Sequence, residues 1–242
     1  MHYREEAGVP ADSSEIELDG VRLAVARDGQ GPAVVCLHAI GHGGGDFADF
    51  ASAVKDRFEV IRIDWPGQGR SGPDPKPLSP ARYAELLGGV LDQLKIESPI
   101  IIGNSIGGAA AIIHAQDHPV RALVLCDTGG LVPVSRLSRA FCGAFARFFA
   151  GGERRAWWFK PMFCAYYRFM VLPGRAAAKQ RERIVNSSYE IAPILHEAWA
   201  GFAKPDADIR HIASRSKFAC GSRGAEKTRS YPCSRACPAS GS

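Results

Sequence analysis

Ser105 is the residue whose surroundings most clearly indicate chemistry, because it lies in the sequence Gly103-Asn104-Ser105-Ile106-Gly107. A β-branched apolar run precedes it and an alanine-rich segment of helical character follows it, which predicts a tight strand-to-helix turn. Glycines two residues before and after the serine let the strand and helix close around a strained backbone. Such a nucleophile elbow projects the serine hydroxyl above the sheet and aims the Ile106 amide at the place where an oxyanion would form. The alternative is a Gly-Ser turn that only joins a strand to a helix.

The apolar runs of the chain predict the sheet that carries this turn. They cover 33–37, 58–63, 99–102 and 122–126, with helical patterns between them. This alternation is typical of a doubly wound, mostly parallel sheet, which binds its ligands beyond the carboxyl ends of the strands. At those ends lie a Gly-rich loop at 38–45, a turn-rich loop at 64–72, Ser105 and Asp127. We therefore expect an α/β fold whose candidate site residues share one edge of one sheet.

Composition and charge argue against several function classes. The 242 residues are 46% apolar, which is enough for a sizeable core. Of the net charge of +5, the residues from Ser216 onward carry +4, so the average charge of the preceding chain indicates neither a nucleic-acid nor a membrane partner. The chain has no P-loop and no C-x-x-C pair, so we expect no nucleotide cofactor and no metal. No apolar run has the length of a signal peptide or a membrane span, which favours a cytoplasmic protein.

The character of the chain changes after the last of these apolar runs. From Val134 to about Phe202, aromatic residues and arginines crowd together without strand-like runs, which predicts a helical insertion. Rings placed over the sheet edge would form an apolar pocket that excludes water, and the alternative is that they only pack the helices together. We expect a core at 1–132, a cap at 133–203, a return to the core at 204–215, and a disordered or out-of-register tail at 216–242.

Three motifs together resemble the α/β-hydrolase superfamily, and within it the smaller bacterial esterases and meta-cleavage-product hydrolases. They are the oxyanion loop His38-Ala39-Ile40-Gly41, the loop from Asp64 to Ser71, and the elbow around Ser105. The resemblance covers roughly Ser14 to Ile212. Asn104 before the serine, where histidine is commoner, looks like the meta-cleavage hydrolases.

The resemblance implies acyl transfer on a small-molecule substrate. Ser105 would attack a carbonyl, and the amides of Ile40 and Ile106 would stabilise the oxyanion. A histidine would carry the proton, an acid would orient that histidine, and no metal or organic cofactor would be needed. The leading function is a serine hydrolase of a small carboxylic ester or lactone. The alternatives are a hydrolase of the C–C bond in meta-cleavage products and a catalytically impaired chain.

The C-terminal part of the chain departs from the family pattern, in which two further strands bring the triad acid and histidine. Residues 214–242 are rich in Ser, Arg, Gly, Pro and Cys and contain no histidine, so we expect both strands to be missing. The catalytic histidine is therefore unassigned, with His42 and His196 as candidates. Asp127 is the candidate acid, and its alternative role is to cap the following loop.

Two hypotheses account for this departure. The segment after about residue 215 is a frameshifted or truncated reading frame, or the chain is a short homologue with a disordered tail. In either case the strand ending at Asp127 would become an exposed sheet edge, and a homodimer or poor solubility would follow.

Overall fold

The computed structural model describes residues 12–215 and 220–223, in two compact units. One unit comprises the described residues of 1–133 and 206–242, and the other comprises Val134–Pro205. The cap was predicted at 133–203, and the second unit covers nearly the same residues. Among the described residues, no helix is long and apolar enough to cross a membrane.

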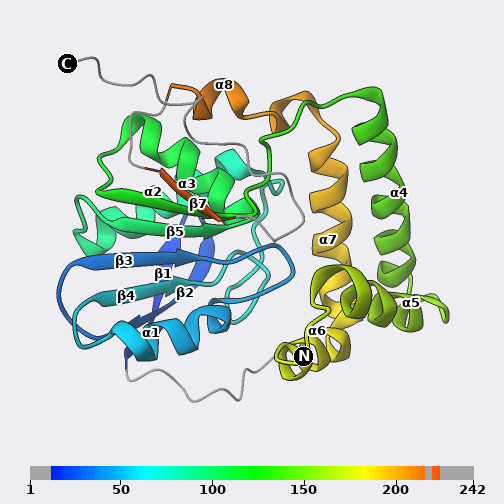
Figure 1. Cartoon of the computed structure of the whole chain (residues 1–242), viewed down its shortest axis with the longest axis horizontal. Coiled ribbons are helices and arrows are strands. Elements are labelled where there is room, and N and C mark those ends of the chain that lie inside the picture. The colour runs from blue at the N-terminus through cyan, green and yellow to red at the C-terminus, as the bar shows by residue number, and fades with distance from the viewer. Residues whose placement is uncertain (1–11, 216–219, 224–242) are drawn as a thin grey trace. The chain divides into compact units, whose positions relative to one another are not determined.

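The first unit is built on a sheet whose seven described strands follow the order β1-β2-β4-β3-β5-β6-β7 (Figure 1). The strands are β1 (Asp12–Leu18), β2 (Val21–Asp28), β3 (Ala33–Leu37), β4 (Glu59–Ile63), β5 (Ile100–Asn104), β6 (Ala122–Cys126) and β7 (Cys220–Arg223). Strands β1 and β2 form an antiparallel hairpin, β2 pairs antiparallel with β4, and all later pairs are parallel. The prediction of a mostly parallel α/β sheet is confirmed.

The helices of this unit follow the strands as the apolar pattern predicts. They are the short 3₁₀ helices η1 (Gly44–Phe47) and η3 (Pro205–Ala207), and α1 (Ala48–Val54), α2 (Pro80–Leu94), α3 (Ile106–Asp117) and α8 (Arg210–Ala213). Helix α2 begins where Ser79 accepts a hydrogen bond from the Arg82 amide and Pro80 occupies the first turn. Strand side chains such as Leu37, Ile61 and Ile101 are fully buried, because helices cover a parallel sheet on both faces.

The second unit is helical, as the sequence predicts for the insertion. Its helices are α4 (Arg136–Glu153), α5 (Phe159–Tyr166), the π-helical segment η2 (Tyr167–Val171), α6 (Ala178–Asn186) and α7 (Ser188–Phe202). Phe149, Phe159 and Phe163 are fully buried within it. Phe145 of α4 stacks on Trp199 of α7 with ring centroids 4.5 Å apart. These rings therefore pack the helices of the unit against one another, which was the alternative role considered for them.

One short strand, β7, follows the helical unit among the described residues, where the family pattern has two. Cys220–Arg223 pairs in parallel with β6, from Leu123↔Cys220 to Cys126↔Arg223. The apolar pattern of the sequence does not predict β7, because a four-residue edge strand is held by backbone hydrogen bonds that any non-proline residue can make. Strand β7, and not β6, is therefore the edge of the described sheet, and a homodimer through an exposed edge stays a prediction. The rest of the predicted tail, 216–219 and 224–242, lies outside the described residues.

Candidate active site

Ser105 connects β5 to α3 in the strained conformation expected of a nucleophile elbow. Its backbone has φ 54° and ψ −115°, outside the regions that side chains ordinarily permit. Hydrogen bonds hold this turn on both sides: the Ser105 amide donates to the Cys126 carbonyl at 3.0 Å, and the Gly129 amide donates to the Ser105 carbonyl at 3.1 Å. Strain of this kind persists only where surrounding contacts impose it, and it is typical of functional sites.

The glycines around Ser105 are required by close approaches of the backbone. A Cβ at Gly103 would lie 2.6 Å from the Gly108 Cα, and a Cβ at Gly107 would lie 2.5 Å from the Leu37 carbonyl oxygen. The second approach brings the first turn of α3 against the end of β3. Because β3 and β5 are paired, with Leu37 opposite Gly103, the loop after β3 begins beside the elbow.

The candidate oxyanion loop begins with a tight turn at residues 39–42. The His42 amide donates to the Ala39 carbonyl at 3.2 Å, and Gly41 occupies the left-handed region with φ 77°. This bond uses neither the Ile40 amide nor its carbonyl. The Ile106 amide opens α3, and the first amides of a helix have no partner within the helix. Ile40 and Ile106 thus remain the candidate oxyanion donors.

The loop at 64–72 braces the oxyanion loop through side chains. Gln68 is buried, accepts a hydrogen bond from the Gly41 amide at 2.6 Å, and donates to the Tyr83 hydroxyl at 3.1 Å. Trp65 is also buried and stacks on Tyr83 with ring centroids 4.3 Å apart. Sequence reasoning assigned no role to Gln68, because a glutamine in a turn-rich loop carries no signal of its own.

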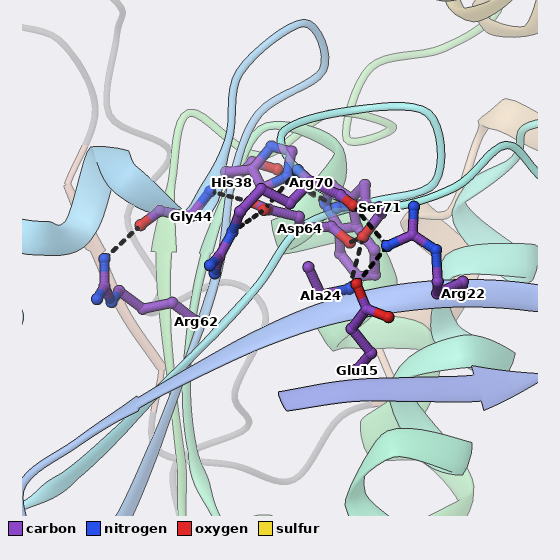
Figure 2. A network of polar contacts seen from close by, with 10 residues as sticks. Glu15, Arg22, Ala24, His38, Gly44, Arg62, Asp64, Arg70 and Ser71 are labelled. Atoms are coloured by element: carbon purple, nitrogen blue, oxygen red, sulfur yellow. Dashed lines mark hydrogen bonds and ion pairs between the residues drawn. The ribbon is translucent and has the colours of Figure 1, made fainter. Parts of the chain in front are cut away.

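Asp64 organises both loops with its buried carboxylate (Figure 2). It accepts hydrogen bonds from the Gly44 amide at 2.7 Å and from the Arg70 amide at 3.0 Å. The Arg62 side chain donates to the Gly44 carbonyl at 3.4 Å, so Gly44 is held from both sides. Gly69 has φ 55° and leaves no room for a Cβ beside this carboxylate. A carboxylate engaged by loop amides in this way acts as a structural acceptor.

His38 is fully buried, and both of its ring nitrogens are engaged. Nε2 accepts a hydrogen bond from the Trp65 amide at 2.9 Å, and Nδ1 lies 2.7 Å from the Ala39 carbonyl, to which it therefore donates. Burial lowers the pKa of His38, which keeps the ring neutral in this tautomer. His38 is consequently a structural residue and cannot take a proton from Ser105 without losing a buried hydrogen bond.

His42 pairs with a carboxylate on the same loop. Its Nδ1 lies 2.6 Å from Oδ2 of Asp46, and both side chains are largely buried. A carboxylate on one ring nitrogen orients a histidine, as in a catalytic triad. Sequence reasoning named His42 as a candidate base but did not recognise Asp46, although the i,i+4 spacing was visible.

The other described histidines lie in different surroundings. His114 and His118 stack with ring centroids 4.3 Å apart at the far end of α3 from Ser105. His196 binds Glu153 at 2.8 Å within the helical unit, and His211 lies on the exposed face of α8. The sequence contains no histidine after His211.

Asp127, the candidate acid, follows β6 directly. It has φ 45°, and its side chain is exposed. Asn104 is the last residue of β5 and is paired with Cys126 at the end of β6. Among the residues that the structure describes, no group of three or more His, Cys, Asp or Glu side chains is arranged to hold a metal ion.

Comparison with known proteins gives the class to which this fold and site belong. A model of the alpha/beta hydrolase family matches residues 34–224, which is most of the chain. The chain therefore belongs to the alpha/beta hydrolase family, and the resemblance inferred from its motifs is confirmed.

Some of the matched relatives are named as enzymes, and others are named only as uncharacterised proteins. An uncharacterised protein of Mycobacterium tuberculosis is 34% identical over 116 residues, which are 47% of this chain and 34% of that protein. The 2-hydroxy-6-oxononadienedioate/2-hydroxy-6-oxononatrienedioate hydrolase of Comamonas testosteroni is 34% identical over 128 residues, which are 49% of this chain and 44% of the enzyme. The chain thus matches less than half the length of these relatives.

Solved structures agree with the fold. A thermophilic esterase from Thermogutta terrifontis has a TM-score of 0.69 at 20% identity, with 88% of this chain and 80% of that chain covered. The N-acyl homoserine lactonase AidH has a TM-score of 0.64 at 22% identity, with 86% of this chain and 76% of that chain covered. At these identities the likeness establishes the fold alone.

Proposed function

We propose that this chain is a serine hydrolase that cleaves a small carboxylic ester or lactone through an acyl-enzyme on Ser105. The observation that carries the proposal is the strained backbone of Ser105, at φ 54° and ψ −115°, between a parallel strand and a helix. No structural need for a strained serine is evident there, whereas a nucleophile must project from the sheet towards its substrate. Membership of a hydrolase family supports the same conclusion.

The reaction would proceed by acyl transfer. The Ser105 hydroxyl attacks the substrate carbonyl, and the Ile40 and Ile106 amides donate to the resulting oxyanion, a contact whose removal costs about 3 to 4 kcal/mol. Collapse of the tetrahedral intermediate expels the alcohol and leaves the acyl-enzyme. Water then attacks the ester, and Ser105 is released with its proton restored.

We further propose that His42, oriented by Asp46, is the base that serves Ser105. The support is their placement: residues 38–46 follow β3 and Ser105 follows β5, and these strands are paired up to their carboxyl ends. His38 is excluded by its two hydrogen bonds, and His114 lies eight residues into α3, or about 12 Å along its axis. Asp127, which directly follows β6, is the alternative acid.

Two alternatives have their own support. The relatives named as hydrolases of 2-hydroxy-6-oxo-dienoates favour cleavage of a C–C bond in such compounds. The engagement of both ring nitrogens of His38 and the placement of His114 at the far end of α3 favour a chain that keeps the elbow without efficient catalysis.

The first experiment compares the full chain with Ser105→Ala in the hydrolysis of p-nitrophenyl acetate and butyrate. Ser52→Ala, an exposed serine on α1, is the matched control. We expect turnover that Ser105→Ala abolishes and Ser52→Ala retains. A dienoate ring-cleavage product that reacts faster than both esters would select the C–C hydrolase instead.

A fluorophosphonate probe separates an impaired enzyme from a wrong assignment, because it reports covalent bonding by intact mass. One adduct that Ser105→Ala removes supports the nucleophile even where turnover is slow. His42→Gln and Asp46→Asn should each lower the labelling rate by about 100-fold or more. Equal labelling of the full chain and Ser105→Ala would overturn the assignment of Ser105.

A further inference from the structure

The two units carry formal charges of opposite sign. Val134–Pro205 contains 12 lysine and arginine residues against 4 aspartate and glutamate residues, a formal charge of +8. Residues 1–133 and 206–215 contain 13 against 20, a formal charge of −7. The near-neutral average on which the expectation of no membrane partner rested is therefore a cancellation between two units.

The positive charge is concentrated in one stretch of the helical unit. Between Glu153 and Glu182 the sequence has no acidic residue and seven basic ones. They are Arg154, Arg155, Lys160, Arg168, Arg175, Lys179 and Arg181. Such a stretch attracts anionic surfaces over roughly the Debye length, about 8 to 10 Å at physiological salt.

The same stretch exposes large apolar side chains. Trp157 is 88% exposed, Phe169 76%, Met170 65% and Met162 55%. Met162 and Phe169 are seven residues apart on the continuous helical run α5–η2, so they share one face. Lys160 and Arg168 are exposed at other positions around the same run.

The opposite face of this run supplies the core of the unit. Phe159 and Phe163 are fully buried and Tyr167 is 2% exposed. Three aromatic rings on the inner side of the run therefore pack it into the unit. The exposed Met and Phe side chains on its outer side take no part in that packing.

We propose that the exposed surface of this segment, which comprises Trp157, Lys160, Met162, Arg168 and Phe169 and is here called the cationic apolar face, docks on the surface of an anionic lipid bilayer. Basic residues beside exposed Trp and Phe are the composition of helices that lie in a membrane interface. The cations bind lipid headgroups, each contributing roughly a fivefold increase in partition, while the apolar side chains enter the acyl boundary and Trp157 occupies the interface itself.

Charge complementarity favours a bilayer over a second copy of this chain. A symmetric dimer through the cationic apolar face would bring Lys160 and Arg168 of both copies together without a carboxylate between 154 and 181 to pair with them. An anionic bilayer offers both countercharge and an apolar phase.

The test is flotation of the full chain with vesicles of phosphatidylcholine alone or mixed in equal parts with phosphatidylglycerol. We expect flotation with the mixed vesicles only, a blue shift of tryptophan emission, and loss of binding as salt is raised to about 1 M. The paired substitution Lys160→Glu with Arg168→Glu should lower the partition coefficient by about tenfold or more. Trp157→Ser with Phe169→Ser should lower it while leaving the charge unchanged.

The matched control is Lys95→Glu with Arg121→Glu, which makes the same change of charge at exposed positions of the first unit. It should bind the mixed vesicles as the unsubstituted chain does. The proposal is overturned by an absence of flotation, by equal losses in the control and the test pair, or by self-association in light scattering that Trp157→Ser with Phe169→Ser abolishes. None of these readouts depends on hydrolysis, so failure here leaves the proposed function untouched.

Discussion

Trp65 donates two hydrogen bonds of 2.9 Å to His38, one from its amide to the imidazole Nε2 and one from its indole Nε1 to the His38 carbonyl. Residues 27 positions apart are thereby joined at both backbone and side chain, in a buried environment where hydrogen bonds hold geometry most strictly. The loop that carries the candidate oxyanion donor Ile40 begins at this junction. Its position therefore depends on the loop after β4 as much as on its own strand.

Gln68 should position the oxyanion loop without touching the substrate. Gln68→Met removes the acceptor of the Gly41 amide while keeping the side-chain volume. Because the loop then loses this hydrogen bond, kcat for p-nitrophenyl butyrate should fall between about tenfold and 100-fold. KM should change little, because the substrate pocket is retained. Gln93→Met, on the exposed side of α2, is the control. An unchanged kcat in Gln68→Met would remove Gln68 from this role.

Asp64→Asn should destabilise the first unit. The carboxylate accepts from two loop amides and lies near the Arg70 guanidinium, and an amide group can present only one acceptor oxygen to them. We expect the free energy of unfolding in urea to fall by about 2 to 4 kcal/mol. Asp56→Asn, whose side chain is exposed, should change it by less than about 0.5 kcal/mol. Equal stability of the two variants would contradict the role assigned to Asp64.

His114 should make the protein acid-sensitive. Burial lowers the pKa of His114 to about 4 from an unfolded value of 6.5, and its Nδ1 has no hydrogen-bond partner among the described residues. Between these values the unfolded chain binds more protons than the folded one, so stability falls as the pH falls, by up to about 3 kcal/mol near pH 4.

The measurement is urea denaturation between about pH 7 and pH 4. His114→Leu should flatten the pH dependence, although it also changes packing at neutral pH, so the slope and not the absolute stability is compared. His211→Gln, an exposed histidine, should keep the slope of the unsubstituted protein. A slope unaltered by His114→Leu would assign the acid sensitivity to other groups.

Two glycine-to-alanine changes should have opposite signs. In Gly107→Ala the new Cβ would lie 2.5 Å from the Leu37 carbonyl oxygen, so the junction of β3 with α3 must open and stability should fall by more than about 2 kcal/mol. In Gly143→Ala, within α4, no atom lies within 4 Å of the new Cβ. The helix should gain about 0.5 to 1 kcal/mol from the lower entropy of the unfolded chain. Thermal unfolding of both variants measures the difference, and a stable Gly107→Ala would contradict the close packing of the elbow.

The sequence alone predicted the strands from β3 to β6, the elbow at Ser105, and the gathering of the loops at 38–45 and 64–72 at one edge. These follow from local rules. A continuous apolar run predicts a buried strand, glycines around a serine predict a tight turn, and parallel strands place their carboxyl ends together.

The tertiary structure decided what depends on approach between distant segments. Strand β7 is paired with β6 by backbone hydrogen bonds, which do not depend on the side-chain pattern. The sequence of this segment therefore predicted only a polar tail. The tautomer of His38 is set by Trp65, and the use of Gln68 is set by the amide of Gly41, 27 residues away. Hydrogen bonds depend on distance in space, which periodicity along the chain does not encode.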